Sequence, residues 1–236
     1  MQPTKTNAPN ALPWQEIDTV LLDMDGTLLD LHYDNYFWTE HLPQRYAEAH
    51  SIPLEDAHAQ LMAHIKAHEG TLKWYCLEFW SDSLQLDIRK LKEEVKDKIE
   101  IRPFVVDFLA SLKQLGKKLV LITNAHPQSL DLKLEVTAID SWLDMVLSSH
   151  QFQYPKEAQE FWHALQAHEH FEPARSLFID DTVRILTSAK TFGIKHLLCI
   201  QQPDSKTPRD TIVEYPTIHH FDELLPSLHQ LLDNNE

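Results

Sequence analysis

The stretch DTVLLDMDGTLLDL, residues 18–31, decides the fold of this chain. Its apolar run ends in two aspartates, Asp23 and Asp25, which are followed by Gly26 and Thr27. Two carboxylates delivered to one spot by a buried strand cost free energy unless a cation or a reaction offsets their charge. The pattern therefore predicts a strand over 18–23 that carries a pair of acids into a functional site.

Apolar runs that resemble this strand recur along the chain and alternate with helical segments. The further expected strands are 118–123, 144–148, 176–180 and 195–200, and the helices among them are 127–138, 156–168 and 182–192. Nearly continuous apolar runs indicate a sheet covered on both faces, and the alternation is typical of parallel βαβ units. We therefore expect an α/β fold with a doubly wound, Rossmann-like parallel sheet.

The segment between the first two strands breaks this alternation, because it contains only helical patterns. The expected helices are 35–50, 53–69, 71–85 and 88–100, followed by 104–115, which ends at Gly116. A helical block inserted after the first strand indicates a second, smaller domain. We expect a core at 14–29 and 102–236, a helical insertion at 30–101 and a flexible N-terminal tail at 1–13. The stretch 202–216 is expected to be an irregular surface loop.

Composition limits the classes of partner. The net charge of -15 argues against a protein that binds nucleic acid through its phosphates. No apolar stretch approaches the roughly 20 residues needed to span a bilayer, so no membrane partner is expected. The polar N-terminus does not resemble a signal peptide, and Cys76 and Cys199 lack a pairing motif, which together favour a cytoplasmic protein with reduced thiols. The fifteen histidines are scattered and are interpreted mainly as surface residues.

Polar side chains gather where the expected strands end. Asp23 and Asp25 end the first strand, Thr123 and Asn124 the second, and Asp180 and Asp181 the fourth, while Lys156 follows the third after a short loop. Ligands bind outside the carboxyl ends of the strands in an open parallel sheet, so these residues should converge.

This set of groups suits phosphoryl transfer. Carboxylates from two strands are the hard oxygen ligands that Mg²⁺ prefers. An aspartate can attack phosphorus, and a second carboxylate can protonate the leaving oxygen and then activate water. A lysine and a threonine hydroxyl can hold the remaining phosphoryl oxygens. Calcium binding of the EF-hand type is excluded, because Leu28 and Asp34 occupy the positions that need glycine and a bidentate acid.

Four motifs, in order, resemble those of the haloacid dehalogenase-like (HAD) superfamily of phosphohydrolases: DMDGT, LITN, the lysine of YPK, and FIDD. The resemblance implies that Asp23 is the nucleophile and Asp25 the general acid/base. It implies that Thr123, Asn124 and Lys156 bind the phosphoryl group. It also implies a Mg²⁺ site formed by Asp23, the backbone carbonyl of Asp25, and Asp180. Asp181 is either a further ligand or a neighbour of the ligands.

The insertion at 30–101 resembles the family's helical type I cap, which selects the substrate. The phrases LLDMDGTLLDLHYDNYFW, TLKWYCLEFW, LITNAHP and YPKE resemble those of bacterial purine 5′-nucleotidases, which implies hydrolysis of GMP or IMP. A phosphatase or phosphomutase acting on a sugar phosphate or phosphoglycolate is the alternative, and a catalytically silent binding module is a third reading.

The insertion also carries aromatic and acidic residues with two open readings. Tyr33, Tyr36, Phe37 and Trp38, and the pair Trp74-Tyr75, either pack in a core or stack on a purine. Asp30 and Asp34 either contact the ribose or the base, or cap a helix.

Overall fold

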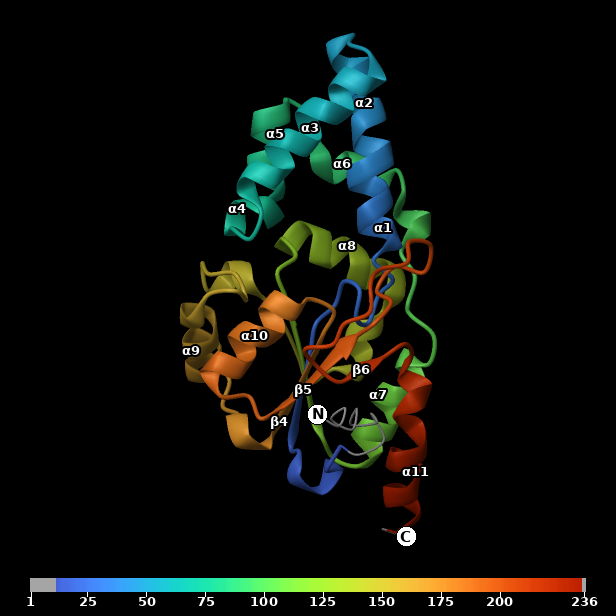
Figure 1. Cartoon of the computed structure of the whole chain (residues 1–236), viewed down its shortest axis with the longest axis vertical. Helices are drawn as coiled ribbons and strands as arrows, with labels where there is room; N and C mark the ends of the chain where they lie inside the picture. Colours follow the sequence, from blue (N-terminus) through green and yellow to red (C-terminus); the bar gives the residue numbers. More distant parts are fainter. Residues whose placement is uncertain (1–11, 235–236) are drawn as a thin grey trace, which may run out of the picture.

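The computed structural model describes residues 12–234, and its centre is a parallel sheet of six strands (Figure 1). The strands are β1 (Thr19–Leu22), β2 (Lys118–Thr123), β3 (Met145–Ser148), β4 (Ser176–Asp180), β5 (His196–Ile200) and β6 (Thr217–Ile218). Their order is β3-β2-β1-β4-β5-β6, and every neighbouring pair is parallel. The predicted doubly wound sheet is confirmed, and the two-residue β6 is an addition to it.

Helices cover both faces of the sheet, which explains the apolar runs. Val20 and Leu22 of β1 belong to a core cluster with residues of α7 (Val105–Gln114), α8 (Pro127–Thr137) and α11 (Leu225–Asp233). Leu21, which points to the opposite face, belongs to a second cluster with α9 (Gln159–His168) and α10 (Val183–Phe192). Each fully buried leucine contributes roughly 1.5–3 kcal/mol, so β1 is held firmly between two layers.

Strand β1 lies where the strand order reverses, which places its end at the usual ligand-binding crevice. The chain turns sharply there at Gly26, whose φ is +82°. A Cβ at this position would lie 2.9 Å from the Asp181 Cγ and 2.9 Å from the Pro203 Cβ. Glycine is therefore required both by the left-handed backbone and by the close approach of two other segments.

The residues expected as an insertion form a group of helices beyond the carboxyl edge of the sheet, drawn in blue to green in Figure 1. These are α1 (His32–Tyr36), α2 (Leu42–His50), α3 (Leu54–His68), α4 (Leu72–Tyr75), α5 (Leu77–Leu84) and α6 (Ile88–Glu93). We call them the helical layer. The division of the chain into a core and an inserted domain stays a prediction.

The boundaries of several expected helices were wrong. A π-helical turn, Phe37–His41, joins α1 to α2, and extended backbone at Cys76 separates α4 from α5. The helix expected over 88–100 ends at Glu93 and is followed by a 3₁₀ turn, Lys96–Lys98. The helix expected at 156 begins at Gln159, so Lys156 lies in the preceding turn.

The loop expected on the surface at 202–216 is partly buried. Pro203 and Asp204 are covered, because the Leu31 N–H donates to the Pro203 carbonyl at 3.0 Å and the Asn35 amide donates to the Asp204 carboxylate at 2.7 Å. This loop therefore joins the core to the start of the helical layer. The expected tail falls mainly on residues 1–11, which lie outside the described part, and Trp14 just after it is buried. No helix in 12–234 is both long enough and apolar enough to cross a membrane.

Candidate active site

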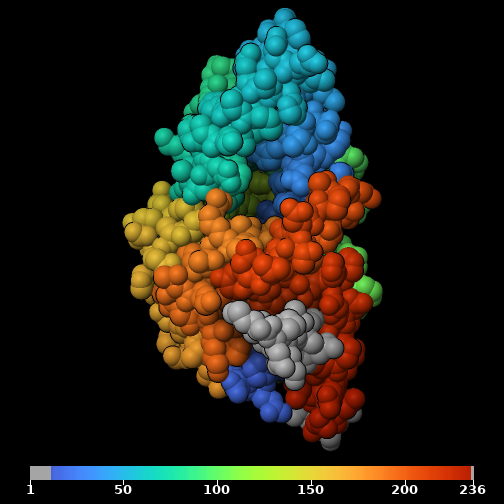
Figure 2. All heavy atoms as spheres, viewed as in Figure 1, coloured from blue at the N-terminus to red at the C-terminus, as the bar shows by residue number. Residues whose placement is uncertain are grey.

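A pocket of about 280 Å³ lies between the carboxyl edge of the sheet and the helical layer. Figure 2 shows the recess between the blue and cyan helices and the orange body of the molecule. The structure brings all of the predicted site residues to this pocket: Asp23, Asp25, Thr123, Asn124, Lys156 and Asp180. Asp181 lines the pocket as well.

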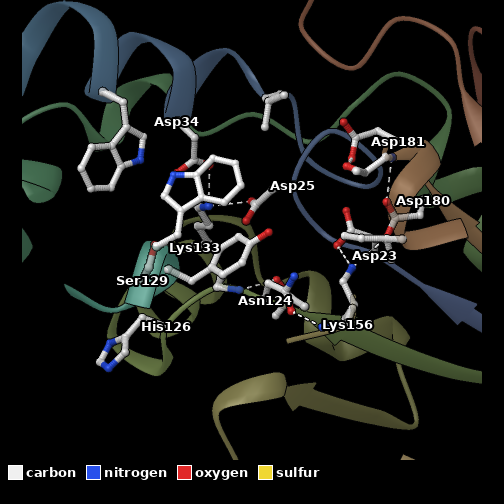
Figure 3. Close-up of a pocket in the computed structure, with 18 of the residues that line it drawn as sticks. Asp23, Asp25, Asp34, Asn124, His126, Ser129, Lys133, Lys156, Asp180 and Asp181 are labelled. Carbon is white, nitrogen blue, oxygen red and sulfur yellow. Dashed lines mark hydrogen bonds and ion pairs between the residues drawn. The ribbon is translucent and has the colours of Figure 1, made fainter. Parts of the chain in front are cut away.

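Lys156 is the buried cation at the floor of the pocket (Figure 3). Its Nζ donates to Asp23 Oδ1 at 2.5 Å, to Asp180 Oδ2 at 2.8 Å and to the Ile122 carbonyl at 3.2 Å. Its backbone N–H donates to the Asn124 side-chain oxygen at 2.9 Å. Burial would lower the pKa of this lysine, but the attraction of the two carboxylates raises it, so the ammonium is maintained.

The three acids at the ends of β1 and β4 form a cluster that suits a divalent cation. One carboxylate oxygen from each of Asp23, Asp180 and Asp181 lies within 4.8 Å of the corresponding oxygens of the other two. Burial raises the pKa of each acid to about 6, although Lys156 opposes this shift at Asp23 and Asp180. Three hard oxygen donors with surplus negative charge fit Mg²⁺, which is bound by a few carboxylates together with water and substrate phosphate.

The Asp25 side chain is not part of this cluster and points toward Lys133 of α8 (Figure 3). Its Oδ1 accepts a hydrogen bond from Lys133 Nζ at 2.6 Å, and the same Nζ donates to Asp34 Oδ2 at 2.7 Å. Lys92 donates to the other oxygen of Asp34 at 2.8 Å. Burial raises the pKa of Asp25 to about 6, with Lys133 opposing the shift.

Lys133 is a site residue that the sequence analysis missed. It is 1% exposed, and its pKa is raised because the attraction of Asp25 and Asp34 outweighs the effect of burial. A signal was present: Leu130, Lys133 and Leu134 recur at helical spacing on one face of the segment 127–138. A lysine on an apolar helix face needs a buried partner, and Asp25 and Asp34 are its partners here.

Thr123 and Asn124 organise the loop beneath the pocket. The Thr123 hydroxyl oxygen accepts from the Ala125 N–H at 2.9 Å. The Asn124 amide donates to Glu157 at 3.0 Å, and Glu157 also accepts from the Tyr75 hydroxyl at 3.1 Å. Glu157, another residue that the sequence analysis did not select, thus connects this loop to the helical layer.

The sequence left open whether the aromatic residues of the helical layer pack in a core or face a bound purine, and the structure places some in each position. Trp38 and Trp74 line the pocket. Tyr33 and Phe37 belong to the core, and the Tyr33 hydroxyl donates to the Lys92 carbonyl at 3.1 Å.

Comparisons with known proteins, by sequence and by structure, point to one protein family. Residues 17–193 match the model of the haloacid dehalogenase-like hydrolase family. The chain is 42% identical over 217 residues to the GMP/IMP nucleotidase YrfG of Escherichia coli K12, covering 92% of this chain and 98% of the relative. The Shigella flexneri protein of the same name matches equally well.

Solved structures show the same fold. A HAD phosphatase from Thermococcus onnurineus aligns with a TM-score of 0.72 at 20% identity, covering 92% of this chain and 98% of that one. The putative HAD hydrolase YfnB from Bacillus subtilis aligns with a TM-score of 0.62 at 19% identity, covering 92% and 99%.

Proposed function

Because this chain belongs to the haloacid dehalogenase-like hydrolase family and is a phosphoric monoester hydrolase, we propose that it hydrolyses purine nucleoside 5′-monophosphates. The substrates proposed are GMP and IMP, in line with the name of the relative that is 42% identical. The observation that carries the phosphoryl chemistry is the buried cluster of Asp23, Asp180 and Asp181, in which Lys156 donates to Asp23 and Asp180, next to a separate acid, Asp25.

In this proposal Asp23 and Asp25 divide the chemistry. An Asp23 oxygen attacks phosphorus and forms an aspartyl phosphate, while the bond to the nucleoside oxygen breaks and that oxygen takes a proton from Asp25. Water then attacks phosphorus, Asp25 takes its proton, and phosphate leaves while the Asp23 carboxylate is restored. The pKa of about 6 at Asp25 suits a group that must give and take a proton near neutral pH.

The remaining residues would hold charge in place during both steps. Asp23, Asp180 and Asp181 would bind Mg²⁺, with the Asp25 carbonyl as a further ligand, and the ion supplies positive charge for the phosphoryl oxygens. The Lys156 ammonium would orient Asp23 and face the negative charge that develops on the phosphoryl group during the reaction. Thr123 and Asn124 would complete the binding of the phosphoryl group.

We further propose that the helical layer is a cap domain, residues 30–101, that selects the substrate. Trp38 and Trp74 line the pocket from the helical layer, and an aromatic face there can stack on a purine. We also place the enzyme in the cytoplasm, which suits its two free cysteines, Cys76 and Cys199.

A phosphate-release assay over nucleoside monophosphates, sugar phosphates and phosphoglycolate tests the proposal. We expect release to be fastest from GMP or IMP, to stop with EDTA and to return with Mg²⁺. Preference for a sugar phosphate would overturn the substrate assignment and support the alternative phosphatase reading.

A substitution tests the covalent mechanism separately. Asp23→Asn should be folded and inactive, because an amide cannot form the aspartyl phosphate. Asp18→Asn is the matched control, since Asp18 pairs with Arg175 at the opposite end of β1 and is exposed. Full turnover by Asp23→Asn would contradict the mechanism.

A further inference from the structure

A second group of metal-ligand side chains lies beside the pocket, apart from the aspartate cluster. The thiol of Cys76, a carboxylate oxygen of Glu78 and a ring nitrogen of His126 all lie within 4.8 Å of one another. His126 Nε2 is 2.6 Å from Glu78 Oε2, and the Cys76 Sγ is 3.6 Å from the same oxygen. His126 is buried, contrary to the surface position expected for most histidines.

A fourth side chain of ligand type, His150, adjoins His126 but lies outside the group of three. The His150 ring lies edge-on to the His126 ring, with 5.0 Å between centroids and an interplanar angle of 86°. The His150 Nε2 is buried and makes no hydrogen bond within the described residues. A buried nitrogen without a partner is uncommon, and it is available to a ligand. Burial lowers the pKa of His150 to about 4 and also lowers that of His126, and a lowered pKa favours the neutral ring, which is the form that binds metals.

We propose that Cys76, Glu78 and His126 bind a transition-metal ion of the Zn²⁺ class, with His150 as the fourth donor. One thiolate, one carboxylate and imidazole nitrogens form the mixed sulfur, nitrogen and oxygen donor set that Zn²⁺ accepts in tetrahedral sites. Mg²⁺ takes hard oxygen ligands, so a thiolate and imidazoles select against it. The two clusters therefore differ in donor chemistry and should bind different ions.

Binding requires two proton movements at the cluster. Burial raises the pKa of the Cys76 thiol, so one proton leaves sulfur for solvent when the metal–sulfur bond forms. His126 Nδ1 now accepts a long hydrogen bond, 3.4 Å, from the Gln128 N–H. When Nε2 binds the ion, the ring proton moves to Nδ1 and this long bond is given up.

The ligands come from both sides of the pocket. Cys76 lies between α4 and α5, and Glu78 is in the first turn of α5, whereas His126 immediately precedes α8 and His150 follows β3. A bound ion would therefore tie the helical layer to the core beside the pocket residues Leu77 and Ala125. If the proposed function holds, this tie restricts substrate entry and product release, and Zn²⁺ slows turnover.

Cobalt absorbance tests the site without relying on activity. The full chain, stripped of metal and then supplied with excess Mg²⁺ to fill the aspartate cluster, is titrated with Co²⁺. We expect a thiolate-to-cobalt charge-transfer band that saturates at one equivalent and disappears when Zn²⁺ is added. Cys76→Ser should abolish the band, and Glu78→Gln should weaken Co²⁺ binding by at least about 10-fold, the loss typical even of residues that only support a ligand.

Cys199→Ser is the matched control, because Cys199 is the other free thiol and is buried in the core as a residue of β5. This variant should keep the band. Absence of the band in the unaltered protein, or its persistence in Cys76→Ser, would overturn the proposal. Phosphate release measured with one equivalent of Zn²⁺ then tests whether the ion links the helical layer to the core. Zn²⁺ should slow phosphate release by the unaltered enzyme but not by Cys76→Ser. Equal slowing of both would contradict the tie while leaving the spectroscopic result intact.

Discussion

Lys133→Met should strongly destabilise the protein, because it removes a buried ammonium placed between two buried carboxylates. Lys133 Nζ lies 2.6 Å from Asp25 Oδ1 and 2.7 Å from Asp34 Oδ2. At an effective dielectric constant of about 20, each pair attracts by roughly 6 kcal/mol, and desolvation of the charges cancels much of this. Asp34 keeps Lys92 at 2.8 Å after the substitution, so Asp25 is the acid left unpaired. An unpaired buried charge costs about 3–5 kcal/mol, which is the expected loss in the free energy of unfolding.

Urea unfolding in Mg²⁺ buffer measures this loss as a lower midpoint with an unchanged slope. Lys113→Met is the matched control, because Lys113 pairs with Asp144 at 3.1 Å while both side chains are about 40% exposed. An exposed pair contributes less than about 1 kcal/mol. Adding Asp25→Asn to Lys133→Met should recover part of the loss, since it removes the unpaired charge. A loss no larger than that of Lys113→Met, or no recovery in the double variant, would refute the reasoning.

Two further predictions concern the end of β1. Gly26→Ala should lower the free energy of unfolding by about 1–3 kcal/mol, because φ is +82° and a Cβ would lie 2.9 Å from Asp181 and Pro203. A urea titration measures this loss, and an unchanged midpoint would contradict it. In EDTA, the raised pKa values near 6 of Asp23, Asp180 and Asp181 lie above the unfolded value of about 3.9, so stability should fall as pH rises from about 4 to about 6. Mg²⁺ should therefore raise the melting temperature more at pH 7 than at pH 5 in a thermal shift assay, and equal shifts would show that these acids do not bind it.

The strands could be predicted because each long apolar run is buried on both faces, a property that is visible in the sequence alone. β6 could not, because its two residues pair only with Cys199 and Ile200 and form no run. Helix boundaries in the helical layer were missed for a similar reason. The extended backbone at Cys76 interrupts a continuous helical pattern, and nothing in the local residue types marks the break.

The positions of the acids at the pocket could be predicted because a parallel sheet aligns the ends of its strands. Asp23 follows the register in which Leu22 pairs with Ile179, so Asp180 must lie beside it. Lys133 and Glu157 depend instead on which helix face packs against which neighbour. That information is tertiary, and for Lys133 it appears in the sequence only as a charged residue on an apolar face.

Dependence on tertiary packing also explains why contacts that the helical layer would make to a substrate are harder to infer from the sequence than contacts that the strand ends would make to its phosphoryl group. Asp34 was open to two readings, a contact to the ribose or the base and a helix cap. In the structure its two oxygens accept from Lys92, 58 residues away, and from Lys133, 99 residues away. Although burial opposes ionisation, these two lysines lower the pKa of Asp34 and keep it charged. A ribose hydroxyl would have to compete with two ammonium groups for this carboxylate. Asp34 therefore serves better as the link between the helical layer and Asp25 than as a substrate ligand, and under the proposed function substrate selectivity would rest with pocket residues such as Trp38 and Trp74.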